Sequence, residues 1–142
     1  MAESYDGAEL IKILQKYLPE NSTVLELGIG PGKDMDILKK SYTVTGSDNS
    51  QIFLDKYKEK YQDADLLLLD AVTLQTDRKF DCIYSNKVLH HLTKEDLAKS
   101  LQRQKDVLNS NGIVFHSFWK GNKVENMDGL LFTYYEIEDL KK

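Results

Sequence analysis

Short apolar segments alternate along this chain with longer segments whose apolar residues recur at helical spacing. The apolar segments are bounded by residues that favour turns, and they predict β-strands at residues 23–27, 42–47, 66–69, 80–85 and 113–119. Residues 66–69 are apolar at consecutive positions, a pattern typical of a strand covered on both faces. We therefore expect this strand to lie in the interior of a parallel sheet.

The intervening segments have the periodicity of helices. Helices are predicted at residues 8–18 with Tyr17 on the inward face, at residues 32–40, after the N-cap residue Ser50, and after Thr93. Strands that alternate with helices at this spacing form βαβ units. We expect an α/β fold in which one doubly wound, mostly parallel sheet carries helices on both faces. In such sheets ligands bind beyond the carboxyl ends of the strands.

Composition narrows the classes of partner. The net charge is −4 and there are only two arginines, so the clustered bases that bind nucleic acid are missing from the sequence. Residues 66–69 form the longest apolar run, which is too short to cross a membrane, and no signal peptide is visible. The single cysteine, Cys82, cannot form an internal disulfide. We expect a cytoplasmic protein that binds neither nucleic acid nor membranes; its oligomeric state is not predicted.

A glycine-rich turn follows the first predicted strand. Gly28, Gly30 and Gly32 allow the backbone to approach a ligand closely. A dinucleotide fingerprint would place glycine at position 33, where Lys33 stands. Glu26 lies just before the turn, and its carboxylate would repel a pyrophosphate but attract a sulfonium or an ammonium group. That preference for a cation holds only if the Glu26 side chain points toward the turn rather than into solvent.

Acidic residues also end the second and third predicted strands. Asp48 lies about 20 residues after Gly28, where an acid accepts hydrogen bonds from ribose hydroxyls. Its alternative role is an Asx-turn that leads into the helix at Ser50. Asp70 is placed to accept a hydrogen bond from an adenine amino group, with the small Ala71 leaving room for the ring. The alternative is an ordinary polar strand end.

Histidines follow the fourth strand and lie within the fifth. His90 or His91 would be able to take a proton from an O–H or N–H nucleophile, because the unperturbed histidine pKa is about 6.5. A structural role near the start of the helix is the alternative for both. No third ligand lies at suitable spacing, so we expect no metal site. His116 is expected to be a hydrogen-bonded core residue, and Trp119 packs in the core or walls a substrate pocket.

Taken in chain order, these segments resemble class I S-adenosylmethionine-dependent methyltransferases. Residues 26–32 resemble the acid-x-G-x-G-x-G signature of that family, and Asp48 resembles its ribose-binding acid. Residues 69–71 resemble its adenine-contacting turn, residues 80–92 its fourth strand and the segment that follows, and residues 108–113 the loop before its fifth strand. The resemblance implies the Rossmann-like methyltransferase fold, with S-adenosylmethionine as cofactor and S-adenosylhomocysteine as product.

The resemblance also implies roles for individual residues. The glycine turn with Glu26 would hold the methionine part of the cofactor, Asp48 the ribose, and Asp70 with Ala71 the adenine. The full implied set of cofactor-binding residues is Glu26, Leu27, Gly28, Gly30, Gly32, Asp48, Asn49, Phe53, Asp70, Ala71, Ser85 and Asn86. Asn49 and Phe53 would pack near the adenine ring, and Ser85 with Asn86 would line the methionine end through backbone or side chain. His90 and His91 are the candidate catalytic residues.

The expected function is transfer of a methyl group to a small-molecule acceptor that the sequence does not identify. No Asn-Pro-Pro-Tyr signature of amino methylation follows the fourth strand. Two alternatives stay open: a cofactor-binding module that acts as a non-catalytic partner subunit, and an NAD-dependent oxidoreductase. The family core ends in an antiparallel strand pair that has no counterpart after Trp119. We therefore expect residues 1–142 to be one domain that is truncated at its C-terminus.

Overall fold

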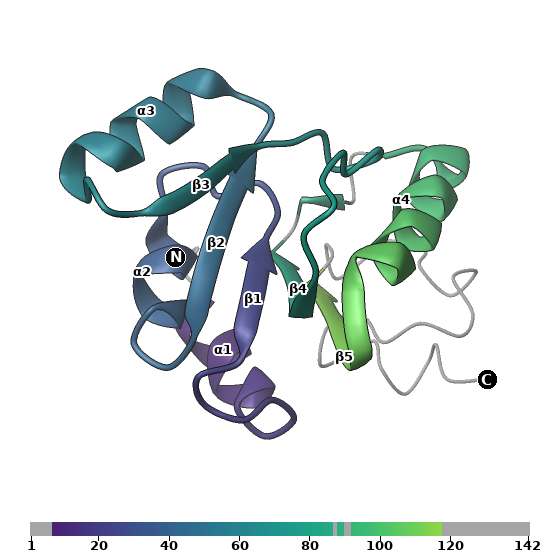
Figure 1. The fold of residues 1–142 in the computed structure, drawn as a ribbon, viewed down its shortest axis with the longest axis horizontal. Coiled ribbons are helices and arrows are strands. Elements are labelled where there is room, and N and C mark those ends of the chain that lie inside the picture. Colours follow the sequence, from purple (N-terminus) through teal and green to yellow (C-terminus); the bar gives the residue numbers. More distant parts are fainter. Residues whose placement is uncertain (1–6, 87, 90–91, 118–142) are drawn as a thin grey trace, which may run out of the picture.

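A computed structural model describes residues 7–86, 88–89 and 92–117. In chain order the elements are α1 (Gly7–Leu14), β1 (Thr23–Glu26), α2 (Lys33–Leu38), β2 (Thr43–Asp48), α3 (Gln51–Lys60), β3 (Asp65–Leu68), β4 (Phe80–Asn86), α4 (Lys94–Val107) and β5 (Leu108–Ser117) (Figure 1). Both candidate catalytic histidines, Trp119 and the expected loss of a strand pair fall outside the described residues. Within the described residues, no helix is long and apolar enough to cross a membrane.

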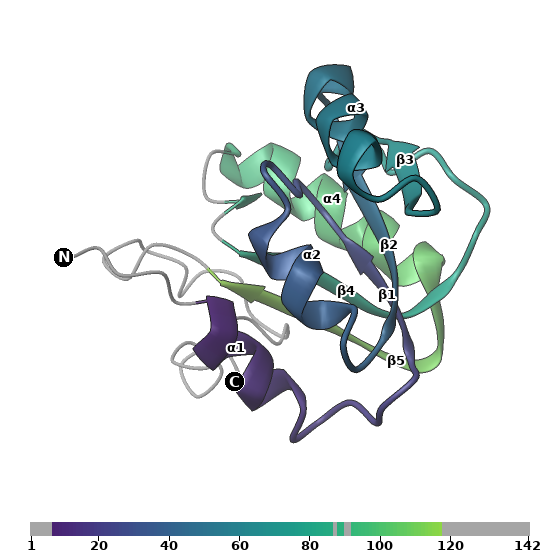
Figure 2. The same ribbon diagram turned by 90° about the vertical axis from the view of Figure 1, so that its left-hand side faces the viewer.

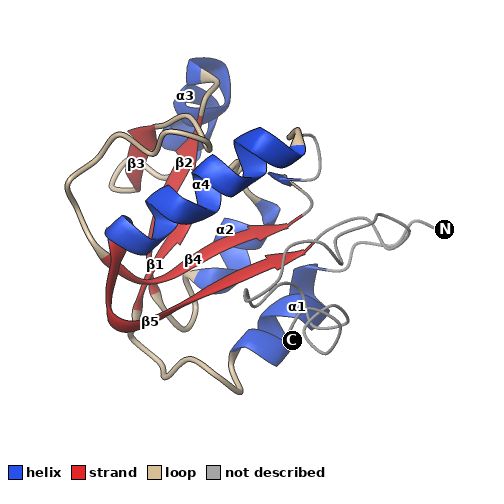
Figure 3. Ribbon diagram, turned by 90° about the vertical axis from the view of Figure 1, so that its right-hand side faces the viewer, coloured by secondary structure: helices blue, strands red, loops and turns tan. Residues whose placement is uncertain are grey.

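The five strands form one sheet in the order β3-β2-β1-β4-β5, and every pair of neighbours is parallel. The chain builds outward from β1 through β2 to β3 and then returns to the other side of β1 for β4. The sheet is therefore doubly wound, and the strand order reverses at β1 and β4, where such sheets bind ligands. Figure 2 shows α1 and α2 on one face, and Figure 3 shows α4 on the other. The predicted fold class is confirmed.

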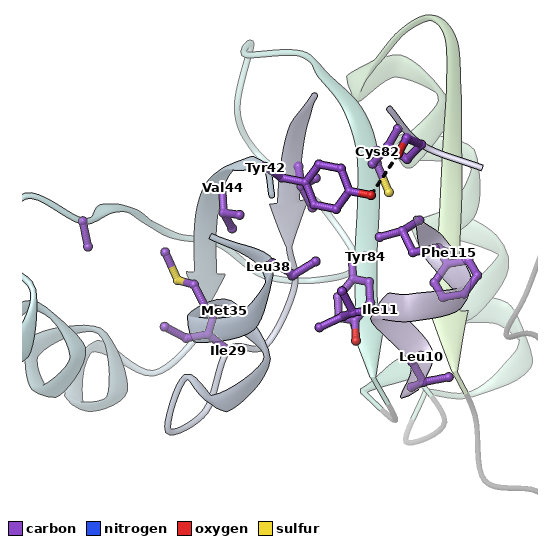
Figure 4. Packing of buried hydrophobic residues seen from close by; sticks show 14 of the residues in the cluster. Leu10, Ile11, Ile29, Met35, Leu38, Tyr42, Val44, Cys82, Tyr84 and Phe115 are labelled. Atoms are coloured by element: carbon purple, nitrogen blue, oxygen red, sulfur yellow. Dashed lines mark hydrogen bonds between the residues drawn. The ribbon is translucent and has the colours of Figure 1, made fainter. Parts of the chain in front are cut away.

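Two apolar clusters hold the layers together, one on each face of the sheet. Cys82 and Tyr84 of β4 pack with α1 and α2 (Figure 4), whereas Ile83, between them in sequence, packs with α4. This alternation follows from the two-residue period of a strand. Each fully buried leucine contributes roughly 1.5–3 kcal/mol relative to an exposed one. Several side chains in these clusters are less than 2% exposed, among them Leu10, Ile11, Leu14, Leu25, Met35 and Leu38.

The expected interior position of the third strand is wrong. β3 lies at one edge of the sheet, and Leu68 is 57% exposed. Leu66 packs against the cluster that contains α2, and Leu67 packs against the cluster that contains α4. The consecutive leucines therefore reflect coverage of both faces of the strand, which an edge strand also has when helices flank the sheet. Position in the strand order does not follow from that pattern.

Two element boundaries differ from the sequence prediction by four residues or more. α1 ends at Leu14 rather than at residue 18, and Tyr17 is 53% exposed instead of facing inward, because the last residues form isolated turns. β5 begins at Leu108, and its register against β4 shifts at a bulge where Asn111 has φ 69°. The predicted cap of α4 is confirmed, since Thr93 Oγ1 accepts a hydrogen bond from the Asp96 amide at 3.0 Å.

Candidate functional site

The glycine turn connects β1 to α2 at the point where the strand order reverses. Its three glycines all have positive φ, at 66°, 52° and 91°. A side chain at Gly32 would overlap the ring of Tyr57, and a Cβ at Gly28 would lie 2.9 Å from a methyl group of Val88. A Cβ at Gly30 would instead enter open space. The turn is therefore packed tightly at its two ends and leaves a hollow beside Gly30.

That hollow is a cavity of about 220 Å³ with an acidic wall. It is lined by Glu26, Gly28, Ile29, Gly30, Pro31, Lys33, Asp34 and Asn86. Glu26 is only 3% exposed, and its Oε1 atom has no hydrogen-bond partner among the described residues. Burial raises the pKa of Glu26 well above its usual range, and the charges of Asp34, Asp36 and Asp48 raise it further. An unpaired buried carboxyl is costly, and a cationic ligand group would supply both a donor and the opposite charge.

Asp34 is a second buried acid at this cavity, and it is not among the predicted site residues. Its Oδ2 atom accepts hydrogen bonds from the Tyr84 hydroxyl at 2.7 Å and from Asn86 Nδ2 at 3.1 Å. Asn86 Oδ1 in turn accepts from Ser117 Oγ at 2.6 Å. These bonds hold the cavity wall in place across α2, β4 and β5. The available signal was spacing, since Asp34 lies four residues before the buried Leu38 on the inward face of α2.

Asp48 fastens the end of β2 to the glycine turn. Its Oδ2 atom accepts from the Gly30 amide at 3.0 Å, and its Oδ1 atom accepts from the Ser50 amide at 2.9 Å. The alternative Asx-turn toward Ser50 is thus present. Each carboxylate oxygen has two lone pairs, so Asp48 keeps acceptor capacity for ligand hydroxyls. Asp48 itself lines neither this cavity nor the one described next, although both of its chain neighbours line the latter.

A second, more apolar cavity of about 80 Å³ shares Gly28 with the first. It is lined by Leu27, Gly28, Ser47, Asn49, Leu69, Ala71 and Val88, which come from the ends of β1, β2 and β3 and from the segment after β4. An acidic cavity and a more apolar one thus meet at Gly28. The structure therefore brings together the predicted residues Glu26, Leu27, Gly28, Gly30, Asn49, Ala71 and Asn86.

Besides Asp48 and Gly32, three further predicted residues line neither cavity. Phe53 is 40% exposed on α3. Asp70 is also exposed, and its Oδ1 atom accepts from the Val72 amide at 2.7 Å, which closes a turn. Ser85 is fully buried, with its hydroxyl 2.7 Å from His116 Nδ1, because it lies two residues after Ile83, on the side of β4 that faces α4. The Ser85 side chain therefore points away from the acidic cavity, and a role of Ser85 through its backbone stays a prediction.

His116 is a buried core residue, as the sequence analysis expected. Its Nε2 atom lies 2.7 Å from Gln104 Oε1, and its other ring nitrogen faces Ser85. Burial lowers the pKa of His116 to about 3, so the ring is neutral at physiological pH. Among the described residues, no group of three His, Cys, Asp or Glu side chains is arranged to hold a metal ion.

A doubly wound parallel sheet whose glycine turn and strand-end acid meet at the strand-order reversal defines a Rossmann-like ligand-binding domain. Residues 24–112 match the family model described as a methyltransferase domain, and the chain belongs to that family. The family model therefore covers both cavities, from β1 to the bulge in β5.

The chain is also similar to individual proteins, and the solved structures among them share its fold. Trans-aconitate 2-methyltransferase of Variovorax paradoxus is 36% identical over 76 residues, which is 51% of this chain and 29% of that protein. The crystal structure of DesVI from Streptomyces venezuelae is 23% identical, with a TM-score of 0.68 over 77% of this chain and 49% of its own. An S-adenosylmethionine-dependent methyltransferase from Clostridium acetobutylicum is 22% identical, with a TM-score of 0.68 over 79% of this chain and 49% of its own. This chain spans half or less of each protein's length.

Proposed function

We propose that this chain is the cofactor-binding core of an S-adenosylmethionine-dependent methyltransferase that acts on a small molecule. The observation that carries the proposal is the Glu26 carboxyl, buried without a partner for Oε1 in the wall of the cavity beside the glycine turn. S-adenosylmethionine carries two positive groups, a sulfonium and an ammonium, at the end of the molecule that such a wall would bind. Relatives whose names state methyltransferase activity support the same conclusion.

The two cavities match the two ends of this cofactor. Glu26 and Asp34 form the acidic wall that would bind the cationic amino-acid end, and Lys33, which lines the same cavity, supplies a positive charge for its carboxylate. The apolar cavity next to Gly28 is suited to an adenosine group, with Asp48 beside it as acceptor for the ribose hydroxyls. The residues present therefore fit a ligand that is cationic at one end and more apolar at the other.

When bound, the cofactor supplies a methyl group on a sulfonium, which is already activated for displacement. The protein then has to align donor and acceptor and exclude water, and orientation of this kind can lower a barrier by roughly 7–11 kcal/mol. Glu26 would hold the amino-acid end of the cofactor and Asp48 its ribose, which would fix the part of the molecule that carries the sulfonium between them. A proton acceptor is needed only for a protonated acceptor group, and His90 or His91 stay our candidates for that role.

The charge of the cavity distinguishes this proposal from an NAD-dependent oxidoreductase. Turnover of an acceptor distinguishes it from a non-catalytic module. A dinucleotide would place a pyrophosphate next to the glycine turn, where two buried acids line the wall and ionisation of either would repel it. A non-catalytic module would bind S-adenosylmethionine but would leave every acceptor unmethylated. The acidic cavity therefore argues against the oxidoreductase and is neutral toward the module.

Calorimetric titration of the full chain with S-adenosylmethionine, S-adenosylhomocysteine and NAD tests the cofactor. We expect the first two ligands to bind and NAD to show no heat. Binding of NAD alone would overturn the proposal. A screen of small-molecule acceptors for release of S-adenosylhomocysteine then tests catalysis, and cofactor binding without turnover on any acceptor would favour the non-catalytic module.

A further inference from the structure

A buried chain of hydrogen bonds runs from the β4–β5 pair through α4 to the loop that walls the apolar cavity. Ser85 Oγ lies 2.7 Å from His116 Nδ1, and His116 Nε2 lies 2.7 Å from Gln104 Oε1. Gln104 Nε2 donates to Ser100 Oγ at 3.0 Å, and Ser100 Oγ donates to the Ala71 carbonyl at 2.5 Å. Ser85, Ser100, Gln104 and His116 have no exposed surface. Ala71, where the chain of bonds ends, lines the apolar cavity.

The Ala71 carbonyl is the last acceptor of this series of hydrogen bonds, and it fixes the donor and the acceptor of every other bond in the series. The Ala71 carbonyl only accepts, so the Ser100 hydroxyl donates to it and must accept from the Gln104 amide. Gln104 then turns its carbonyl oxygen toward His116, which requires a proton on Nε2. His116 Nδ1 is left as the acceptor for the Ser85 hydroxyl. The neutral Nε2–H tautomer of His116 is therefore required by the arrangement.

Arg103 holds the next part of the same loop. Its guanidinium donates to the carbonyls of Thr73 and Leu74 at 3.2 and 3.1 Å and to that of Thr76 at 2.9 Å. With Ser100, two side chains of α4 thus bind four carbonyl groups of residues 71–76, a segment that belongs to no helix or strand. The wall of the apolar cavity consequently depends on α4, whose own residues do not line that cavity.

We propose that Ser100, Gln104, His116 and Arg103 are positioning residues for the adenosine end of the cofactor. The inference rests on the proposed function. Holding the loop before the ligand arrives removes the ordering cost that a free loop would add to binding. These residues touch the protein wall and not the ligand, so their removal weakens binding of every ligand that carries adenosine and leaves the recognition of the amino-acid end to Glu26.

The test compares two ligands that share adenosine and differ at the amino-acid end: S-adenosylhomocysteine and 5′-methylthioadenosine. In the full chain, Ser100→Ala is expected to weaken both by the same factor of about five- to tenfold, as the loss of one buried hydrogen bond implies. Glu26→Gln is expected to weaken only S-adenosylhomocysteine. Thr45→Val removes another buried hydroxyl, one that donates to Asp65 away from both cavities, and should change neither affinity.

A spectroscopic measurement separates positioning from general destabilisation. The ¹⁵N shifts of His116 should report the Nε2–H tautomer, and the Nε2–H resonance should move when 5′-methylthioadenosine is added to the wild type. In Ser100→Ala that ligand-induced shift should be lost. The proposal would be overturned if the His116 resonance did not shift on addition of the ligand to the wild type, or if His116 were the Nδ1–H tautomer.

Arg103→Met provides a second variant in case Ser100→Ala does not fold. It keeps the apolar stem and loses the three loop contacts, so we expect both ligands to bind several-fold more weakly. Lys58→Met is its control, because Lys58 donates to the Ala64 carbonyl far from the loop. Wild-type affinity in folded Ser100→Ala and in Arg103→Met would overturn this inference alone. A wild-type chain that binds neither ligand would overturn the proposed function as well.

Discussion

The Gly30 amide donates a hydrogen bond to Asp48 Oδ2 at 3.0 Å, and this bond joins the glycine turn after β1 to the end of β2. The two residues are 18 positions apart in sequence. Their contact places the strand-end acid beside the hollow at Gly30, between the acidic and the apolar cavity. This bond links Gly30, which lines the acidic cavity, to the strand end whose neighbours line the apolar cavity.

Replacement of Asp48 by alanine should therefore impair both binding and stability. We expect at least a tenfold loss of S-adenosylhomocysteine affinity by calorimetry. We also expect the folded state to lose about 1–3 kcal/mol, because the Gly30 and Ser50 amides lose their acceptor. Asp63→Ala, at an exposed position, is the control and should alter neither. Unchanged affinity in a folded Asp48→Ala protein would refute the assignment of Asp48.

Glu26→Gln should stabilise the protein at neutral pH. Between the ordinary carboxyl pKa of 4.5 and the raised pKa of Glu26, the folded chain retains a proton that the unfolded chain has released. Stability must therefore fall as the pH rises through this window. Urea denaturation of the wild type and of Glu26→Gln at a series of pH values checks this. The stability difference should grow in favour of the variant with increasing pH, and a constant difference would contradict the prediction.

Binding of a cationic ligand at Glu26 should release protons. The ligand favours the ionised carboxylate, whereas burial favours the protonated form, so binding and ionisation are coupled. Calorimetry of S-adenosylmethionine binding in phosphate and in Tris, which differ in ionisation enthalpy, measures the number of protons released. We expect release from the wild type that is greatly reduced in Glu26→Gln. Equal heats in the two buffers for the wild type would argue against a buried cation–carboxyl pair.

Alanine at Gly32 should mainly reduce stability, whereas alanine at Gly30 should mainly reduce ligand binding. At Gly32 the new methyl group overlaps the Tyr57 ring, so we expect a loss of stability large enough to see as a clear drop in Tm. At Gly30 the methyl enters the open cavity, and the left-handed backbone alone costs roughly 1–2 kcal/mol. Gly30→Ala should remain folded and bind S-adenosylhomocysteine poorly. Normal binding by folded Gly30→Ala would show that the hollow is not the ligand site.

Local sequence signals predicted the fold class and the positions of the strand ends, because glycines, acids and apolar runs act within a few residues. Contacts made only in the folded chain were not predicted. Asp34 is held in the cavity wall by a hydrogen bond from the Tyr84 hydroxyl. Tyr84 lies 50 residues away in sequence, and no local pattern indicates such a bond. Likewise, the leucines of β3 indicated burial on two faces but not an edge position. Phe53 had a plausible spacing, yet α3 directs it away from both cavities.

The bonds at the ends of β4 and β5 make ligand binding sensitive to how these two strands are paired. Asn86 and Ser117 are joined on the side of the acidic cavity, whereas their immediate neighbours Ser85 and His116 are joined on the side of α4. A slip of one residue between the strands would exchange the two sides and break both junctions at once. Cofactor affinity should therefore depend on the register of β4 against β5. Chains with a slipped register should fail to bind to an immobilised S-adenosylhomocysteine column.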